Sequence, residues 1–165
     1  MAETVDRDFI RLLNENMGIA VKISRLYFNG CNLDREDALQ EMMFQLWKSY
    51  PQFKRGSKFS TWMYSVCLNT ALTFRRKQSK SDTISIDEEH ERLASPSQET
   101  GFEDELNRLN LAISTLSPVN KAVILLYLDE MSYDEIASVI GISRSNVSVR
   151  LVRIKKELEL KMKPF

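Results

Sequence analysis

Apolar residues recur at three- and four-residue spacing along most of the chain, which places them on one side of an α-helix. The first such set predicts one helix or a broken pair of helices that ends at Gly30, and it comprises Phe9, Leu12, Leu13, Ile19, Ala20, Ile23, Leu26 and Tyr27. We expect a further helix from an N-cap at Asp34 to about residue 49, where Pro51 stops it, and another over about residues 60–77. No segment alternates with the two-residue period that is typical of a strand.

The middle of the chain, residues 79–101, is polar and acidic and has few large apolar side chains. Such a composition predicts a flexible linker between two small domains, residues 1–78 and 102–165. His90, the only histidine, lies in this linker, where a solvated side chain is expected rather than a ligand or a general base. A second helical set follows the linker, and it comprises Phe102, Leu106, Leu109, Ile113 and Leu116.

Two short capped helices are predicted near the C-terminus. Ser132 and Glu135 have the spacing of a capping box, and Gly141 suits the sharp turn after a helix over about residues 133–140. Ser143 then caps a second helix, and two helices joined by a glycine turn form a helix-turn-helix. The predicted fold is therefore all-α, with two small helical domains joined by a flexible acidic linker and a helix-turn-helix in the C-terminal domain.

The second helix of this unit has two different sides when each residue is given about 100° of rotation. Its core side holds Val147, Leu151, Ile154 and Leu158, and its opposite side holds Ser145, Ser148, Val149, Val152, Arg153 and Lys156. Short polar groups, small apolar groups and cations suit the base edges, thymine methyl groups and phosphates of a major groove. A helix of an ordinary bundle is the alternative, but two outward valines beside a cation are poor choices for a merely solvated face.

The charges are segregated along the chain, although the net charge is zero. Residues 42–81 contain no acid and eight cations, namely Lys48, Lys54, Arg55, Lys58, Arg75, Arg76, Lys77 and Lys80. Residues 82–105 contain nine acids against Arg92 alone, and residues 144–156 contain five cations and no acid. Two basic blocks favour two surfaces that bind polyanions, with an ordinary solvated surface as the alternative for each.

The first basic block also contains aromatic residues, namely Phe53, Phe59, Trp62, Tyr64 and Phe74. Cations that follow a backbone, together with rings on which bases stack, make a surface for single-stranded nucleic acid. Phe59 and Trp62 are also candidates for the core, and we expect at least one of them to be buried there.

Composition and motifs argue against several classes of protein. No apolar run approaches the roughly 18–20 residues that span a bilayer, and the N-terminus lacks the apolar core of a signal peptide, so a cytoplasmic protein without membrane insertion is expected. Cys31 and Cys67 have neither a CxxC motif nor a nearby histidine, which predicts no disulfide and no metal site. The chain has no Gly-rich phosphate loop, no nucleophile motif and no convergent carboxylate cluster on a predicted pocket, so an enzyme is the least supported class.

The motifs of the two predicted domains resemble the conserved regions of sigma-70 factors. In the first domain the similar stretches are DALQE (37–41), LW (46–47), KFSTWMY (58–64), Asn69 and RR (75–76). In the second they are LSP (116–118), LL (125–126), MSYDEIA (131–137) and IGIS (140–143). The resemblance covers about residues 9–78 and 102–160, and the absence of a middle domain or a long N-terminal extension is typical of the extracytoplasmic-function (ECF) type.

The resemblance implies an alternative sigma factor that directs core RNA polymerase to promoters, performs no catalysis and needs no cofactor. Residues 1–78 would bind the clamp helices of the largest polymerase subunit through Asp37, Gln40, Glu41 and Phe44. These four residues also share one helical face, opposite Leu39 and Leu46. Other polymerase subunits and an anti-sigma protein are further candidate partners.

Promoter DNA, both duplex and single-stranded, is the second implied partner. The residues that match the family's −10 surface are Phe53, Lys54, Arg55, Lys58, Phe59, Trp62, Asn69, Arg75 and Arg76, and the loop over residues 52–58 would receive an extruded base. The residues implied at the −35 duplex are Arg144, Ser145, Asn146, Ser148, Val149, Arg150, Val152, Arg153 and Lys156.

Two positions depart from the family pattern. Ser65 and Val66 replace the tryptophan pair of primary family members. This difference predicts weaker melting of the duplex and a stricter requirement for a matching promoter sequence. Ser148 and Val149 replace a lysine and a serine of the common recognition helix, so the family's −35 sequence preference does not transfer. The alternative function is a stand-alone helix-turn-helix regulator whose first domain dimerises or senses a ligand, although the DALQE motif would then have no purpose.

Overall fold

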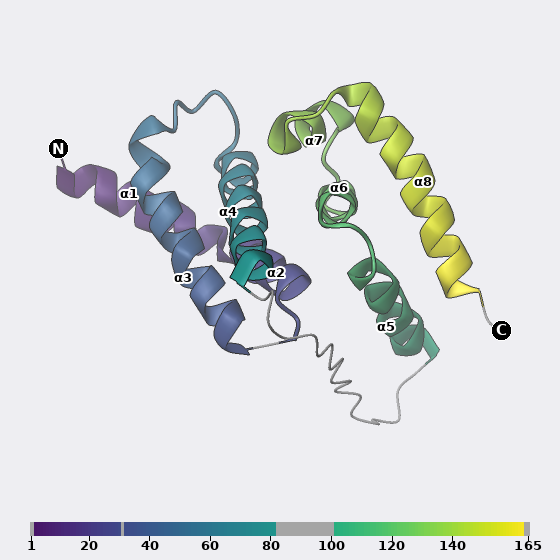
Figure 1. The fold of residues 1–165 in the computed structure, drawn as a ribbon. Coiled ribbons are helices and arrows are strands. Elements are labelled where there is room, and N and C mark those ends of the chain that lie inside the picture. Colours follow the sequence, from purple (N-terminus) through teal and green to yellow (C-terminus); the bar gives the residue numbers. More distant parts are fainter. Residues whose placement is uncertain (1, 31, 82–100, 164–165) are drawn as a thin grey trace. The chain divides into compact units, whose positions relative to one another are not determined.

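The computed structural model describes residues 2–30, 32–81 and 101–163 (Figure 1). Within these ranges the chain forms eight α-helices and one short 3-10 helix, and no strand, which confirms the predicted all-α fold. The chain divides into two compact units, one over residues 1–88 with the helices α1–α4 and one over residues 89–165 with α5–α8. Each unit is described below by itself.

The N-terminal unit contains α1 (Ala2–Glu15), α2 (Met17–Tyr27), α3 (Asn32–Ser49), the 3-10 helix η1 (Tyr50–Gln52) and α4 (Phe59–Ser81). The predicted broken pair is α1 and α2, which are interrupted at Asn16, where the side-chain amide donates a 2.8 Å hydrogen bond to the Leu12 carbonyl. The predicted N-cap at Asp34 is wrong: α3 begins at Asn32, so Asp34 lies in the first turn. A carboxylate there still interacts favourably with the helix dipole.

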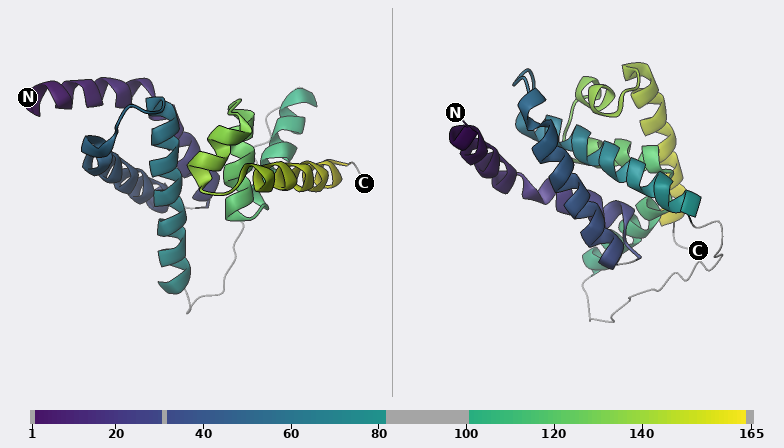
Figure 2. Two further views of the ribbon diagram at one scale, coloured as in Figure 1. Left: turned by 90° about the horizontal axis from the view of Figure 1, so that it is seen from above. Right: turned by 60° about the vertical axis from the view of Figure 1, so that its left-hand side comes forward.

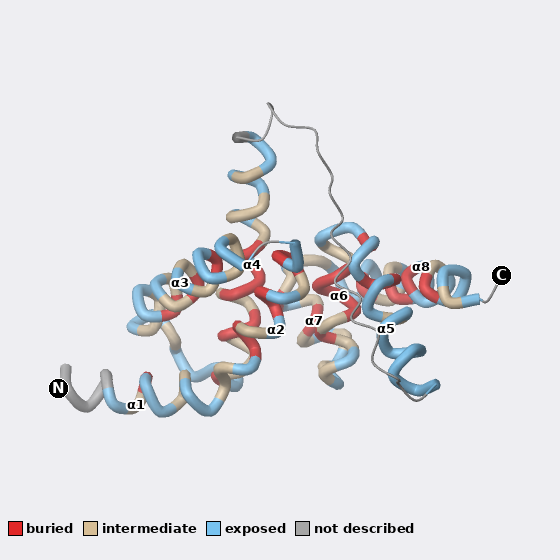
Figure 3. The backbone as a smooth tube through the Cα atoms, turned by 90° about the horizontal axis from the view of Figure 1, so that it is seen from below, coloured by how far each residue is buried: buried red, intermediate tan, exposed pale blue. Residues whose placement is uncertain are grey.

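The core of this unit lies between α2, α3 and α4, which pack side by side (Figure 2). Its fully buried side chains include Ile23, Met42, Leu46, Met63 and Cys67. Figure 3 shows buried stretches of the backbone on all three helices. Burial away from water disfavours a thiolate, and it raises the pKa of the Cys67 thiol to about 12. The packing of α2, α3 and α4 around this core determines which side chains lie on their outer faces.

The C-terminal unit contains α5 (Gly101–Ser114), α6 (Pro118–Leu128), α7 (Tyr133–Ile140) and α8 (Arg144–Met162). The capping box is present in full: the Ser132 hydroxyl accepts from the Glu135 amide, and the Glu135 carboxylate accepts from the Ser132 amide. Gly141 ends α7 with a left-handed φ of 79°, which glycine adopts without steric cost. The Ser143 hydroxyl then accepts a 3.1 Å hydrogen bond from the Asn146 backbone N–H and so caps α8. The predicted turn between α7 and α8 is confirmed.

Both ends of the predicted linker, residues 79–101, are helical. Residues 79–81 are the last residues of α4, and Gly101 is the first residue of α5. The remainder, residues 82–100 with His90, lies outside the described residues, so its flexibility stays a prediction.

Within the described ranges no helix has the length and apolar character needed to cross a membrane. The same residues contain no group of three or more His, Cys, Asp or Glu side chains that could hold a metal ion.

Candidate functional site

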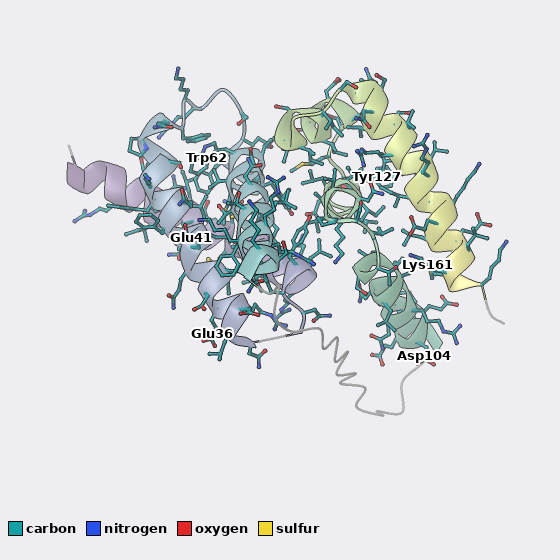
Figure 4. All side chains as sticks on the ribbon, in the orientation of Figure 1. Glu36, Glu41, Trp62, Asp104, Tyr127 and Lys161 are labelled. Atoms are coloured by element: carbon teal, nitrogen blue, oxygen red, sulfur yellow. The ribbon has the colours of Figure 1, made fainter. Side chains whose placement is uncertain are left out.

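The first candidate surface is the outward face of α3. This helix buries Ala38, Met42 and Leu46 against its neighbours and leaves Leu39 half-buried. The four residues predicted to bind polymerase lie together on the other side, with Asp37, Gln40 and Phe44 exposed and Glu41 half-buried. The Glu41 carboxylate, labelled in Figure 4, accepts a 2.9 Å hydrogen bond from the Gln45 side-chain amide.

Two large apolar residues on this face were not among the predicted binding residues. Trp47 is 61% exposed, and its ring centroid lies 6.4 Å from that of Phe44, which is 50% exposed. Leu33, at 71% exposed, lies on the same side near the start of α3. Their helical spacing to Asp37 and Phe44 was the signal that could have found them. Exposed apolar side chains gathered on one face are typical of a binding surface.

The second candidate surface rests on a cluster of aromatic rings under the loop between η1 and α4. The rings of Tyr50, Phe53, Phe59 and Trp62 have neighbouring centroids 5.1–6.4 Å apart. Phe9 from α1 joins the cluster, with its centroid 4.8 Å from that of Tyr50. The cluster fixes both ends of the loop to the body of the unit.

Burial divides the aromatic residues predicted to bind the −10 strand. Phe59 is only 7% exposed, so its ring is covered by protein and belongs to the core. This agrees with the expectation that at least one of Phe59 and Trp62 is buried there. Phe53 and Trp62 are half-buried, and Trp62 is labelled in Figure 4. These two rings therefore retain surface on which a base could stack.

The cations of this surface lie on the loop and along α4. Lys54, Arg55 and Lys58 are exposed, and Arg55 adopts a left-handed φ of 54°, which is uncommon for a residue with a side chain. The Arg55 guanidinium lies 3.8 Å from the Asp8 carboxylate, but both side chains are solvated, so this pair contributes little to stability. Exposed positive charge is therefore held on a loop that the aromatic cluster anchors.

Farther along α4 the predicted residues differ in their surroundings. Asn69 and Arg76 are exposed, whereas Arg75 is half-buried, and its guanidinium donates a 3.4 Å hydrogen bond to the Tyr27 carbonyl at the end of α2. Phe74 packs edge-on against Phe28, with centroids 5.4 Å apart. Arg75 thus has a contact inside the protein that its position in the sequence does not indicate.

The third candidate surface is the outward side of α8. Val147, Leu151, Ile154 and Leu158 are buried, as their spacing predicts. On the other side Ser145, Val149, Val152, Arg153 and Lys156 are exposed, and Ser148 is half-buried. Val149 and Val152 are 48% and 54% exposed, so their small apolar groups are available to a partner.

Three other residues predicted to contact the −35 duplex interact with the protein itself. Arg144 lies 3.7 Å from Asp134 in an exposed ion pair between α8 and α7. The Arg150 Nε donates to Asn146 Oδ1 at 3.0 Å, and its Nη1 donates to Asn120 Oδ1 on α6 at 2.9 Å. Asn120 was absent from the predicted site, because nothing in its local sequence indicates a contact with an arginine thirty residues later in the chain.

Two further cations of α8 have partners outside that helix. The Lys155 ammonium donates a 3.0 Å hydrogen bond to the Tyr127 hydroxyl and lies 4.3 Å from the centroid of its ring. This hydrogen bond is the main cause that raises the pKa of Lys155 above its ordinary value. The Lys161 ammonium, labelled in Figure 4, donates a hydrogen bond to the Thr115 hydroxyl, just beyond α5.

Two family models match the chain in the order that its motifs predict. The model of Sigma-70 region 2 matches residues 12–81, and that of Sigma-70, region 4 matches residues 106–158. The two matches together cover most of the chain and contain all three candidate surfaces. The chain therefore belongs to the sigma-70 family.

Curated relatives narrow this assignment. The ECF RNA polymerase sigma-E factor of Escherichia coli (strain K12) is 25% identical, over 89% of this chain and 82% of that protein. The protein of the same name from Haemophilus influenzae is 26% identical, over 80% of this chain and 76% of that protein. Together with the family models, they make this chain an ECF-type alternative sigma factor, and sigma factors are transcription initiation factors rather than enzymes.

Solved structures have the same fold. The sigma factor RpoE from Bartonella quintana, in a co-crystal with the anti-sigma factor NepR, matches with a TM-score of 0.75 at 20% identity and covers 94% of this chain and 97% of that chain. CnrH, in complex with the cytosolic domain of CnrY, matches with a TM-score of 0.65 at 20% identity and covers 94% and 87% of the two chains.

Proposed function

We propose that the N-terminal unit binds core RNA polymerase through the outward face of α3 and captures the −10 strand, while α8 of the C-terminal unit reads the −35 duplex. The observation that carries this proposal is the group of exposed apolar residues, Leu33, Phe44 and Trp47, beside Asp37 and Gln40. A stand-alone regulator could use exposed apolar residues to dimerise, but the DALQE motif (37–41) on this helix would then have no purpose. The clamp helices of the largest polymerase subunit are the proposed partner of this face.

For the −10 strand we propose a division of labour within the loop and α4. Lys54, Arg55, Lys58 and Arg76 are solvated and would bind phosphates, which fix the register of the strand. Phe53 and Trp62 would offer ring faces to bases, with Asn69 farther along the exposed side of α4. The buried Phe59 would support the loop without touching DNA, and Arg75 would hold α4 to the end of α2.

For the −35 duplex we propose that α8 enters the major groove with its exposed side. Ser145, Ser148 and Arg153 would reach base edges or phosphates, and Val149 and Val152 would contact thymine methyl groups. Lys156 is exposed in the middle of this side and Asn146 is exposed at its margin. The ion pair of Arg144 with Asp134 is solvated enough to exchange for a phosphate.

The structural relatives RpoE and CnrH were solved with NepR and with the cytosolic domain of CnrY, and NepR is an anti-sigma factor. An anti-sigma protein is accordingly a proposed partner of this chain too. We further propose that the protein acts in the cytoplasm, without membrane insertion, and uses the polymerase active site with no cofactor or catalytic group of its own.

The test is run-off transcription with purified core polymerase on genomic fragments, preceded by co-purification of the two proteins. We expect a stable complex that starts RNA at sites where core polymerase alone does not. The stand-alone regulator predicts a different result, namely duplex binding without polymerase and no new start sites. Failure to join core polymerase, or an unchanged set of start sites, would contradict the proposed function.

A further inference from the structure

Two cations of α8 lie at the two borders of its buried stripe, which consists of Val147, Leu151, Ile154 and Leu158. At 100° per residue, Arg150 lies about 70° to one side of the centre of this stripe and Lys155 about 70° to the other. Neither residue therefore shares the outward side with Val149 and Arg153.

The partners of both cations belong to one helix, α6. Arg150 donates to Asn120 Oδ1 at 2.9 Å and Lys155 donates to the Tyr127 hydroxyl at 3.0 Å. Asn120 and Tyr127 are seven residues apart, so they lie on the same side of α6, two turns from each other. The Asn146 side chain also accepts from Arg150 at 3.0 Å, which orients the guanidinium toward α6.

The buried stripe alone does not determine the rotation of α8 about its axis. Apolar burial is non-directional, whereas a hydrogen bond weakens steeply when its geometry is distorted. Because side-chain tips lie about 5–6 Å from a helix axis, a rotation of about 20° would move them by about 2 Å, which is enough to lose a hydrogen bond to a base edge. Two hydrogen bonds at opposite borders of the stripe resist rotation in both directions.

We infer that Asn120 is a positioning residue for promoter recognition: with Tyr127 it holds Arg150 and Lys155 and thereby fixes the rotation of α8 on which sequence reading depends. Arg150 accordingly acts inside the protein and does not contact the −35 duplex. This inference rests on the proposed reading of the −35 duplex by α8. It assigns specificity to a residue of α6 that no base needs to touch.

The test compares full-length variants bound to core polymerase, on a promoter found by run-off transcription and on the same DNA with a scrambled −35 element. Asn120→Ala removes the acceptor, whereas Asn120→Asp keeps an oxygen for the guanidinium. We expect Asn120→Ala to lower the ratio of cognate to scrambled affinity by about tenfold, the lower range for a lost base contact. Asn120→Asp should restore most of this ratio, and the exposed Asn110→Ala on α5 should leave it unchanged.

Salt dependence separates positioning from direct contact with DNA. A lost phosphate contact lowers the slope of log affinity against log salt by about one, whereas a rotated helix changes discrimination with the slope retained. We therefore expect Arg150→Ala and Asn120→Ala to lose discrimination at unchanged slope. A slope lowered by about one in Arg150→Ala would place Arg150 on a phosphate and overturn the inference.

Circular dichroism melting shows whether each variant is folded. If Asn120→Ala loses helix, Tyr127→Phe decides, because it removes only the hydroxyl of the second tether: reduced discrimination supports the inference and full discrimination overturns it. If the wild type itself fails to discriminate, the proposed function fails. If the wild type discriminates and Arg153→Ala does not, yet folded Asn120→Ala discriminates fully, the inference alone fails.

Discussion

Trp47 lies beside Phe44 on the outward face of α3, with ring centroids 6.4 Å apart and with 61% and 50% of the two residues exposed to solvent. The Lys48 ammonium lies 6.0 Å from the Phe44 ring, so a cation borders the pair. Covering a water-exposed aromatic ring with a partner removes apolar surface from water, which favours binding. Such residues often dominate the energetics of an interface. The relationship makes these two rings the centre of the proposed polymerase contact.

We therefore predict that Phe44→Ala and Trp47→Ala each weaken binding to core polymerase by about 1–4 kcal/mol, the range of strong interface residues. The free energy of unfolding should change by no more than about 0.5 kcal/mol, because neither ring is part of the core. Binding is measured by competition with a labelled wild-type chain. Ile10→Ala, which alters a 53% exposed apolar residue on α1, is the matched control. Equal competition by all three variants would remove the pair from the interface.

A separate prediction concerns Arg153, which is exposed on the outward side of α8. Arg153→Ala should weaken binding to a cognate −35 duplex by about 1–3 kcal/mol if its side chain contacts a base. Arg108→Ala, which removes an exposed arginine from α5, is the control for a general change in charge. Affinity is measured by fluorescence anisotropy at several salt concentrations. Wild-type affinity in the Arg153 variant would exclude this residue from the contact.

Local sequence was sufficient to predict the C-terminal turn but not the contacts of its arginines. The capping box of Ser132 and the left-handed Gly141 depend only on neighbouring residues, so spacing identified them. The hydrogen bonds of Arg75 to Tyr27 and of Arg150 to Asn120 join residues 48 and 30 positions apart. Charge patterning identifies a cation but not its partner, because the partner is brought near only by the packing of helices.

The same limit applies to the aromatic residues and the exposed faces. Helical spacing correctly placed Asp37, Gln40, Glu41 and Phe44 on one side of α3, since one helix determines that geometry. It could not rank Phe59 against Trp62, because their burial depends on rings contributed by η1 and the following loop. Resemblance to a family likewise gives a residue's alignment and not its exposure.

Burial of Phe59 leads to a prediction about stability. Phe59→Ala should lower the free energy of unfolding by about 3–5 kcal/mol, because it leaves a cavity between the rings of Tyr50, Phe53 and Trp62. Trp62→Phe keeps most of the aromatic surface and should cost clearly less. Both values come from urea unfolding followed by circular dichroism. A Phe59→Ala variant as stable as the wild type would show that the ring is not part of a packed core.

The last prediction uses the buried thiol of Cys67, whose pKa is raised from 9.0 to about 12 by burial. In a Cys31→Ser background Cys67 is the only thiol, so a thiol reagent at about pH 8 should label the unfolded chain quickly and the native chain very slowly. The folded state keeps the thiol proton at pH values where the unfolded state has lost it. The free energy of unfolding should therefore fall as the pH rises from about 9 towards 12, and it should fall less in Cys31→Ser/Cys67→Ala. Parallel pH profiles for the two variants, or rapid labelling of the native chain, would show that water reaches Cys67 in the folded protein.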